Sequence, residues 1–457
     1  MKPKKELKTP LKFFDKKGFL AVLVALAAIF VFFVLPLYTQ AATNDELEQK
    51  IAESNAKIAE LEREIAQYEN QLVTIGNQKA TLENEVSRLD LSRKKIGADI
   101  SATQSKINSA DLELENLGGE IGNKERQIEN GRAVIGRSLR TIYQEGETTF
   151  AEQILASAKL SDVWEETDKL RRLESALRDE IKVLQNTKEE LRVNYEEVED
   201  QQVKLIALKR ELAGQKAVLD QNRQEQATLL SQTKNKESGY QKLLDEKREA
   251  KAEFEQQINE YENQLAYNLD PSKIPSPGSG VLNFPLSDDF MSRCITKEKV
   301  YGNIYCITQY FGNTAFAQSG AYNGKGHNGI DFGIPEGTRI GTALSGVVQA
   351  VGNTDQYRGC YSYGKWVLVR HGNGLSTLYA HLSHISVGAG ESVGTGGLIG
   401  YSGKTGYATG PHLHFTVYVA DAVQLVRLGD IKSKTNCANA IVPVAATAAY
   451  LNPIQYL

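Results

Sequence analysis

Five side chains able to bind a metal or to transfer protons lie in three short blocks in the last third of the chain. The blocks read Gly-His-Asn-Gly-Ile-Asp, Leu-Tyr-Ala-His-Leu and Gly-Pro-His-Leu-His-Phe, and they carry His327, Asp331, His381, His412 and His414. Side chains two residues apart on a strand point to the same face, so His412 and His414 aim into one pocket. We expect the three blocks to converge on one zinc ion.

A hydrolytic zinc site needs three nitrogen or oxygen ligands and leaves a fourth position to water. His327 and Asp331 are candidate ligands because the glycines of their block let the backbone curl. One member of the pair His412 and His414 completes the set. Bound Zn²⁺ lowers the pKa of water to about 7 and polarises a carbonyl group. Neutral imidazole titrates in the range that proton transfer needs, so His381 and the other member of the pair are candidates for that task.

The elements that must position these residues are short strands. Beyond residue 281 the sequence consists of short apolar runs punctuated by glycine, at 346–352, 365–370, 375–382, 393–399 and 414–419. This spacing predicts a mainly antiparallel β domain over residues 281–457. The proline-, serine- and glycine-rich segment 270–280 predicts a linker in front of it.

A long helical region precedes the linker. Apolar residues step by four and three over 47–142 and again over 170–265, and no proline lies between Pro36 and Pro271. The pattern predicts a coiled coil within residues 43–269. The repeat fails over 143–165, which we interpret as a helical cap at the turn of a long antiparallel hairpin. Two parallel coils in a homodimer are the alternative.

Residues 1–42 predict export. Seven lysines lie in residues 1–17, and Gly18 to Leu35 follows without a charged side chain; this run spans ~27 Å as a helix, close to the thickness of a bilayer. A lysine-rich flank stays in the cytoplasm, so we expect the rest of the chain on the other side of the membrane. The segment is either a signal peptide cut near Thr39 to Ala42 or a retained membrane anchor, and both interpretations stay open.

The cysteines and the charge agree with this location. All four cysteines fall beyond residue 290 and none forms a Cys-x-x-Cys pair, so we expect two disulfides rather than a structural zinc site. Among three possible pairings we favour Cys294 with Cys306 and Cys360 with Cys437. The formal net charge of −4, with no long basic stripe, argues against nucleic acid as a partner.

The three blocks, in this order and with the closing Leu451-Asn-Pro453, resemble the lysostaphin-like or LytM family of zinc metallopeptidases. The resemblance covers roughly residues 284–457 and implies one Zn²⁺ per chain and peptidoglycan as the substrate. It also implies that the metal ligands are His327, Asp331 and His414. The pair that activates water and steadies the tetrahedral intermediate is then His381 and His412. Segments 286–326 and 355–363 depart from the usual pattern of the family.

The interrupted coil resembles another group. The run Arg140-Thr-Ile-Tyr-Gln-Glu-Gly146, followed by Leu160-Ser-Asp162 and Leu170-Arg-Arg-Leu173, is similar to EnvC-like and PcsB-like envelope proteins. This resemblance implies docking to an FtsE and FtsX type division complex on the outer side of a bacterial cytoplasmic membrane, with relief of autoinhibition. We therefore expect an exported peptidoglycan endopeptidase regulated through its coil. The alternative is a non-catalytic activator of another wall hydrolase, which the intact set of five positions disfavours.

Overall fold

The computed structural model describes residues 44–76, 80–145, 160–265, 267–288, 290–291, 306–313, 326–431 and 436–457. Residues 1–50 and 51–457 form two units, and every contact given below lies within the second. The leader predicted over residues 1–42 lies outside the described residues. Among the described helices, none has the length and apolar character that a bilayer crossing requires.

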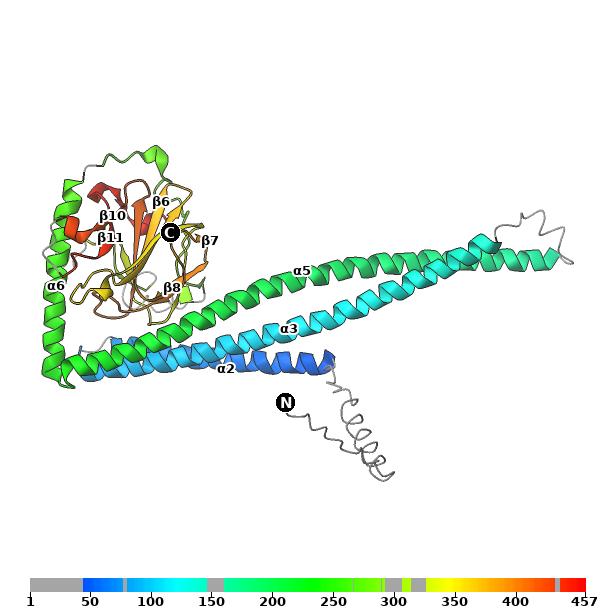
Figure 1. Ribbon diagram of the computed structural model, residues 1–457, viewed down its shortest axis with the longest axis horizontal. Helices are drawn as coiled ribbons and strands as arrows, with labels where there is room; N and C mark the ends of the chain where they lie inside the picture. Colours follow the sequence, from blue (N-terminus) through cyan, green and yellow to red (C-terminus); the bar gives the residue numbers. More distant parts are fainter. Residues whose placement is uncertain are drawn as a thin grey trace, which may run out of the picture. The chain divides into compact units, whose positions relative to one another are not determined.

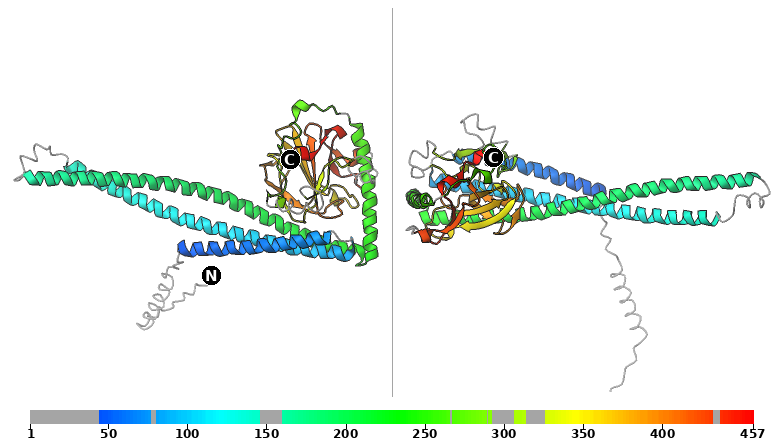
Figure 2. Two further views of the ribbon diagram at one scale, coloured as in Figure 1. Left: turned by 180° about the vertical axis from the view of Figure 1, so that it is seen from behind. Right: turned by 90° about the horizontal axis from the view of Figure 1, so that it is seen from above.

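The described part of the N-terminal region contains the helices α2 (Asn44–Gly76), α3 (Leu82–Glu145), α5 (Leu160–Thr233) and α6 (Glu237–Gln264). Figures 1 and 2 show α3 and α5 side by side. Arg93 donates to Gln226 across 3.3 Å, and Lys124 donates to Asn194 across 3.2 Å. Because the partners follow opposite orders along the two helices, α3 and α5 run antiparallel, as the hairpin interpretation predicts. Residues 146–159 of the expected cap lie outside the described residues.

Neither predicted arm is continuous. The first breaks after Gly76, and α3 starts again behind Thr81, whose hydroxyl accepts from the backbone N–H of Asn84 at 3.2 Å. In the second arm, Lys234 and Asn235 adopt left-handed backbone angles, with φ of 51° and 55°, and this turn separates α5 from α6. The apolar spacing predicts which helix faces are buried. It does not reveal that the chain turns between two such faces.

The C-terminal domain is an antiparallel β structure, as expected. Its ten-stranded sheet has the path β1-β2-β9-β6-β5-β4-β7, with β3, β8 and β12 paired beside it. The strands of this sheet are β1 (Ile307–Gln309), β2 (Ile330–Phe332), β3 (Arg339–Gly341), β4 (Gly346–Asn353), β5 (Lys365–His371), β6 (Leu375–Ile385), β7 (Ser392–Val393), β8 (Leu398–Ser402), β9 (Leu413–Val419) and β12 (Tyr450–Leu451). A separate ribbon pairs β10 (Gln424–Arg427) with β11 (Ile441–Val444).

Helix α6 packs on the β domain rather than on α5. Phe254 and Ile258 are 8% and 6% exposed and belong to the same apolar core as Phe332 and Phe415 of the sheet. Figure 1 shows α6 lying along the domain. The four-residue spacing of Phe254 and Ile258 places both on one face of the helix, so that face is the buried one.

Helices α3 and α5 contact the β domain through a buried ionic cluster, which comprises Glu85, Arg88, Asn222, Glu336 and Lys404. Lys404 Nζ lies 2.6 Å from Glu85, Arg88 lies 3.5 Å from Glu336, and Asn222 donates to Glu336 across 3.3 Å. Charges that are removed from water are costly unless they are paired. Moving the helices away from the domain would break these pairs and return all of these side chains to water at once.

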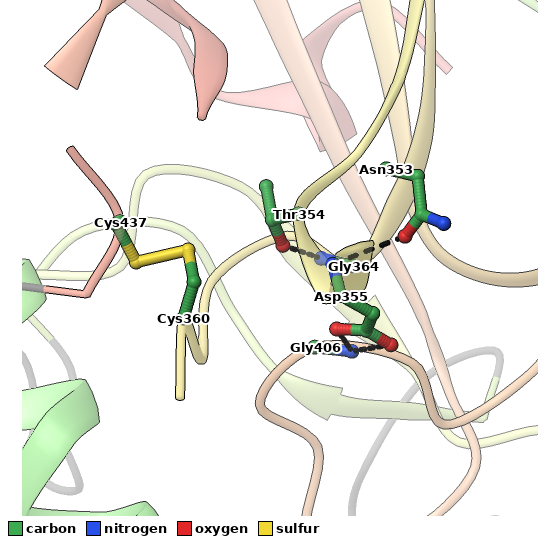
Figure 3. The surroundings of a disulfide bond; sticks show 7 residues. All are labelled: Asn353, Thr354, Asp355, Cys360, Gly364, Gly406 and Cys437. Carbon is green, nitrogen blue, oxygen red and sulfur yellow. Dashed lines mark hydrogen bonds between the residues drawn. A yellow bond between two sulfur atoms is a disulfide. The ribbon is translucent and has the colours of Figure 1, made fainter. Parts of the chain in front are cut away.

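A disulfide joins Cys360, in the loop after β4, to Cys437, in the segment before β11, which confirms this predicted pair (Figure 3). Beside it, both carboxylate oxygens of Asp355 accept from the backbone N–H of Gly406, at 2.9 and 3.0 Å. Cys306 is also disulfide-bonded. Its expected partner, Cys294, lies outside the described residues, so that pairing stays a prediction.

Candidate metal and hydrolytic site

Strands β2 and β9 bring the three candidate ligands together. Asp331 and His414 are direct partners in the antiparallel register of these strands, and His327 stands four residues before Asp331. His414 Nδ1 lies 2.9 Å from Asp331 Oδ1 and 3.1 Å from His327 Nε2, and His327 Nε2 lies 3.3 Å from Asp331 Oδ1. The three residues are buried and form a group able to hold a metal ion.

The spacing of these donor atoms fits a tetrahedral metal site. Ligand bonds of ~2.0–2.1 Å in a tetrahedral zinc site place neighbouring donor atoms ~3.3 Å apart. The observed triangle of 2.9, 3.1 and 3.3 Å is close to one face of such a tetrahedron. On the far side of the His414 ring, Nε2 lies 2.9 Å from the hydroxyl of Thr416, which fixes the orientation of the ring.

The electrostatic environment of the three candidate ligands favours a bound cation. Burial alone would raise the pKa of Asp331, but the charges of His327 and His412 and hydrogen bonds from His327 and His414 bring that pKa well below its usual range. Burial also lowers the pKa of His414, against the opposing effect of its hydrogen bond to Asp331. An ionised carboxylate beside a neutral imidazole is the protonation state that metal ligation requires.

His381 and His412 lie together beside this triad. Their ring centroids are 4.5 Å apart, and the His381 ring is 6.0 Å from that of His414. His381 Nδ1 lies 2.8 Å from the carbonyl oxygen of Thr405, and His412 Nδ1 lies 2.9 Å from that of Gly410. A carbonyl oxygen can only accept, so both Nδ1 atoms carry hydrogen in the neutral rings and both Nε2 atoms present lone pairs.

The backbone at His381 is unusual. Between β5 and β6 the register shifts opposite Lys365 to Val367, and His381 adopts a φ of 60°. A bulge of this kind redirects a side chain, and left-handed backbone outside glycine costs about 1–3 kcal/mol. Burial, followed by the neighbouring His412 and His414, lowers the pKa of His381 well below its usual range. The ring is therefore neutral at neutral pH.

The five side chains line one cavity of about 170 Å³. Helix α6 forms part of its wall with Lys251, Phe254, Glu255, Ile258, Asn259 and Glu262. Lys251 Nζ lies 4.4 Å above the ring of Tyr407, which lines the cavity as well. A substrate that enters this cavity must therefore pass the side chains of α6 that line it.

Sequence reasoning missed part of this site. Tyr363 lines the cavity, its ring lies 5.8 Å from that of His414, and its hydroxyl accepts from Asn328 Nδ2 at 3.2 Å. No metal-ligand or catalytic spacing marks Tyr363, and its position follows only from the fold. The two remaining histidines do not line the cavity: His371 bonds to Ser345 and Thr377, and His384 packs near Tyr401.

Comparison with known proteins gives a family match within the β domain and matches to curated relatives. Residues 325–425 match the model of Peptidase family M23. The DD-carboxypeptidase/endopeptidase Mpg of Neisseria meningitidis is 44% identical over 89 residues, covering 20% of this chain and 19% of that protein. The peptidoglycan DD-endopeptidase ShyA of Vibrio cholerae is 46% identical over 94 residues, covering 20% of each. The matched segment thus spans about a fifth of these relatives.

Solved structures also match part of the chain. A zinc-containing peptidase from Vibrio cholerae is 28% identical over 31% of this chain and 37% of its own, with a TM-score of 0.24. Lysostaphin from Staphylococcus simulans is 26% identical over 33% of this chain and 48% of its own, with a TM-score of 0.23. The family match and the curated relatives confirm the resemblance that the motifs indicated: the C-terminal part of the chain contains a peptidase family M23 domain of the LytM type.

Proposed function

We propose that this chain is an exported zinc metalloendopeptidase that hydrolyses amide bonds in peptidoglycan. The observation that carries the proposal is the meeting of five side chains from three distant blocks in one buried cavity, with three donor atoms at tetrahedral spacing. Support also comes from the names of the matched relatives, which are peptidoglycan endopeptidases. Non-catalytic activation of another hydrolase finds no specific observation in its favour.

In the proposed mechanism His327, Asp331 and His414 hold the metal. A bound zinc ion would supply Lewis-acid chemistry, lowering the pKa of water and polarising the scissile carbonyl. When their rings are neutral, His381 and His412 would present unprotonated Nε2 atoms, because their Nδ1 atoms lie against backbone carbonyl oxygens and carry the hydrogen. One of these imidazoles accepts the proton of the attacking water, and the resulting imidazolium returns it to the departing amine.

We further propose that the helical region regulates access to the cavity. Support comes from α6, whose Lys251 stacks on Tyr407 at the cavity wall and whose Phe254 and Ile258 are buried against the domain. A peptide substrate needs the space that these side chains fill, so the described arrangement is a latent one. A coiled-coil contact with an FtsE and FtsX type complex, and a membrane tether at the N-terminus, would supply the movement that uncovers the site.

The test uses the full chain with His414→Ala, His381→Ala and, as a matched control, His384→Ala, which lies outside the cavity. Each variant is made alone and together with Phe254→Ala, which loosens α6. We expect His414→Ala to lose both the bound metal and the hydrolysis of purified peptidoglycan. His381→Ala should keep the metal and lose turnover by about 10² or more. Release of metal from His381→Ala would contradict the assignment of ligands. Zinc binding without hydrolysis in the chain that carries Phe254→Ala alone, or Phe254→Ala with the control His384→Ala, would favour the activator.

A further inference from the structure

Three buried tyrosines extend the row of polar side chains that begins with the candidate metal ligands on the sheet. Alternation along β9 places His414, Thr416 and Tyr418 on one face. Tyr450 of β12 is the direct register partner of Tyr418, and their ring centroids are 4.8 Å apart. Tyr363 completes the group from the loop before β5, beside His414. We call Tyr363, Tyr418 and Tyr450 the tyrosine cluster.

A carboxylate from α6 enters this cluster. Glu262 is only 5% exposed, and the hydroxyl of Tyr450 donates to its Oε1. Glu262 and Tyr363 line the same cavity as Asp331 and His414, so the cluster is continuous with the candidate metal site. Burial is the largest influence on all three tyrosines, and the negative charge of Glu262 adds to it, so the pKa of each hydroxyl is raised. The hydroxyls therefore stay protonated and remain donors.

A buried carboxylate is stable only where donors replace the water it has lost. Tyr450 provides such a donor to Glu262, and both Glu262 and Tyr363 line the cavity that a substrate must enter. When α6 moves away, the cluster keeps its donors and loses the acceptor that Glu262 supplied. A carboxylate on a substrate would accept the hydrogen bonds that Glu262 accepted. A neutral group in that position would leave the buried hydroxyl donors without an equally strong acceptor.

We propose that the tyrosine cluster is a subsite for a free carboxylate of the substrate, and that Glu262 occupies it as an internal mimic while α6 covers the cavity. This inference rests on the proposed endopeptidase function. It specifies the substrate class: a peptide cross-link in which a residue beside the scissile amide keeps a free carboxylate. Cross-links whose neighbouring residues are neutral, such as amidated stems or glycine bridges, would be poor substrates.

The experiment compares two synthetic cross-linked peptides that differ only in carrying a carboxylate or a carboxamide beside the scissile bond. Both are assayed with the full chain and its Tyr450→Phe and Glu262→Gln variants, with Glu260→Gln on the exposed side of α6 as control. The readout is the ratio of the two kcat/KM values, because uncovering the site raises both rates by one factor and cancels in the ratio.

We expect a ratio of about tenfold or more for the wild-type chain, because a hydrogen bond to a charged group is stronger than one to a neutral group. Tyr450→Phe removes one donor and should bring the ratio toward one. Glu262→Gln should raise both rates and leave the ratio unchanged, and Glu260→Gln should change neither. Equal cleavage of both peptides by the wild-type chain would overturn the subsite.

Binding of both peptides to the Glu262→Gln chain, measured by calorimetry, separates this inference from the proposed function. If neither peptide is cleaved by any variant and the carboxylate peptide still binds about tenfold tighter, the subsite stands and the proposed activity fails. If neither is cleaved and both bind equally, the subsite fails too. Cleavage of both peptides with a ratio that Tyr450→Phe leaves unchanged overturns the subsite alone.

Discussion

Loosening α6 should switch on hydrolysis, and Phe254→Ala is the sharpest way to do it. Phe254 is 8% exposed and packs into the apolar core of the β domain, while its helix forms one wall of the cavity. Full burial of a phenylalanine side chain contributes about 1.5–3 kcal/mol. If most of this stabilisation is lost when α6 leaves the domain, replacing Phe254 with alanine favours the open state over the covered state by about 2 kcal/mol. This corresponds to a roughly thirtyfold change in the equilibrium constant.

The assay follows release of soluble fragments from labelled peptidoglycan by the full chain, alongside hydrogen exchange of the α6 amides. We expect the rate of release to rise up to about thirtyfold, reaching a plateau once the open state dominates. Exchange in α6 should accelerate by a similar factor, while exchange in β5 and β6 stays slow. Gln256→Ala changes an exposed position of the same helix and serves as the control.

Two results would refute this reasoning. Faster exchange in α6 without faster hydrolysis would mean that the helix does not limit access to the cavity. A large fall in melting temperature with slower hydrolysis would mean that Phe254 supports the domain itself, so that covering and folding cannot be separated at this position.

Three further predictions concern stability. Burial, then the charge of Glu225, raises the pKa of Glu336 from its usual 4.5 to about 7. The folded chain therefore binds this proton more tightly than the unfolded chain, and stability should fall as pH rises from about 4.5 to about 7. The melting temperature of Glu336→Gln should vary less than that of the wild-type chain over this window, and an equal fall in both would contradict the assignment. Replacing Cys360 and Cys437 with serine opens a loop with a sequence separation of 77 residues and should cost up to about 4 kcal/mol in denaturant unfolding; no loss would show that the loops hold without the bond. Gly214→Ala should weaken the contact of α5 with the β domain, because its Cβ would lie 2.4 Å from the Tyr401 ring, whereas the control Gly122→Ala, which meets no atom within 4 Å, should gain about 1 kcal/mol from helix propensity. A gain in both variants, read from thermal unfolding, would count against the clash.

The candidate residues could be found from the sequence because their types and spacing within three short blocks are distinctive. The two-residue repeat of a strand places His412 and His414 on one face, and the register of β2 with β9 sets Asp331 opposite His414. The division between ligands and proton carriers came from the resemblance to the family and stays a prediction.

The sequence did not predict that α6 covers the candidate site. Phe254 and Ile258 continue the apolar spacing of the second arm, so they predict a buried helix face without saying what buries it. The turn at Lys234 and Asn235 decides the answer, and neither residue is a strong breaker of helices. The same limit applies to the tyrosine cluster, because Tyr363 and Tyr450 reach His414 and Tyr418 only through strand pairing and loop geometry. Contacts of this kind depend on how distant segments pack together, so they cannot be predicted from any one segment alone.

The short connection between α6 and the β domain has a consequence for the kind of substrate that can gain entry. Only residues 265–281 separate Gln264 from Leu282, where the domain core begins. A segment held on so short a tether acts as a competitor at an effective concentration in the millimolar range, however dilute the protein is. Free fragments of the wall at micromolar levels would lose that competition. A dense polymer presenting many stems at one place, or a pull on the helices, would win it. Under the proposed function we therefore expect the cavity to open on the cell wall itself and not on free fragments.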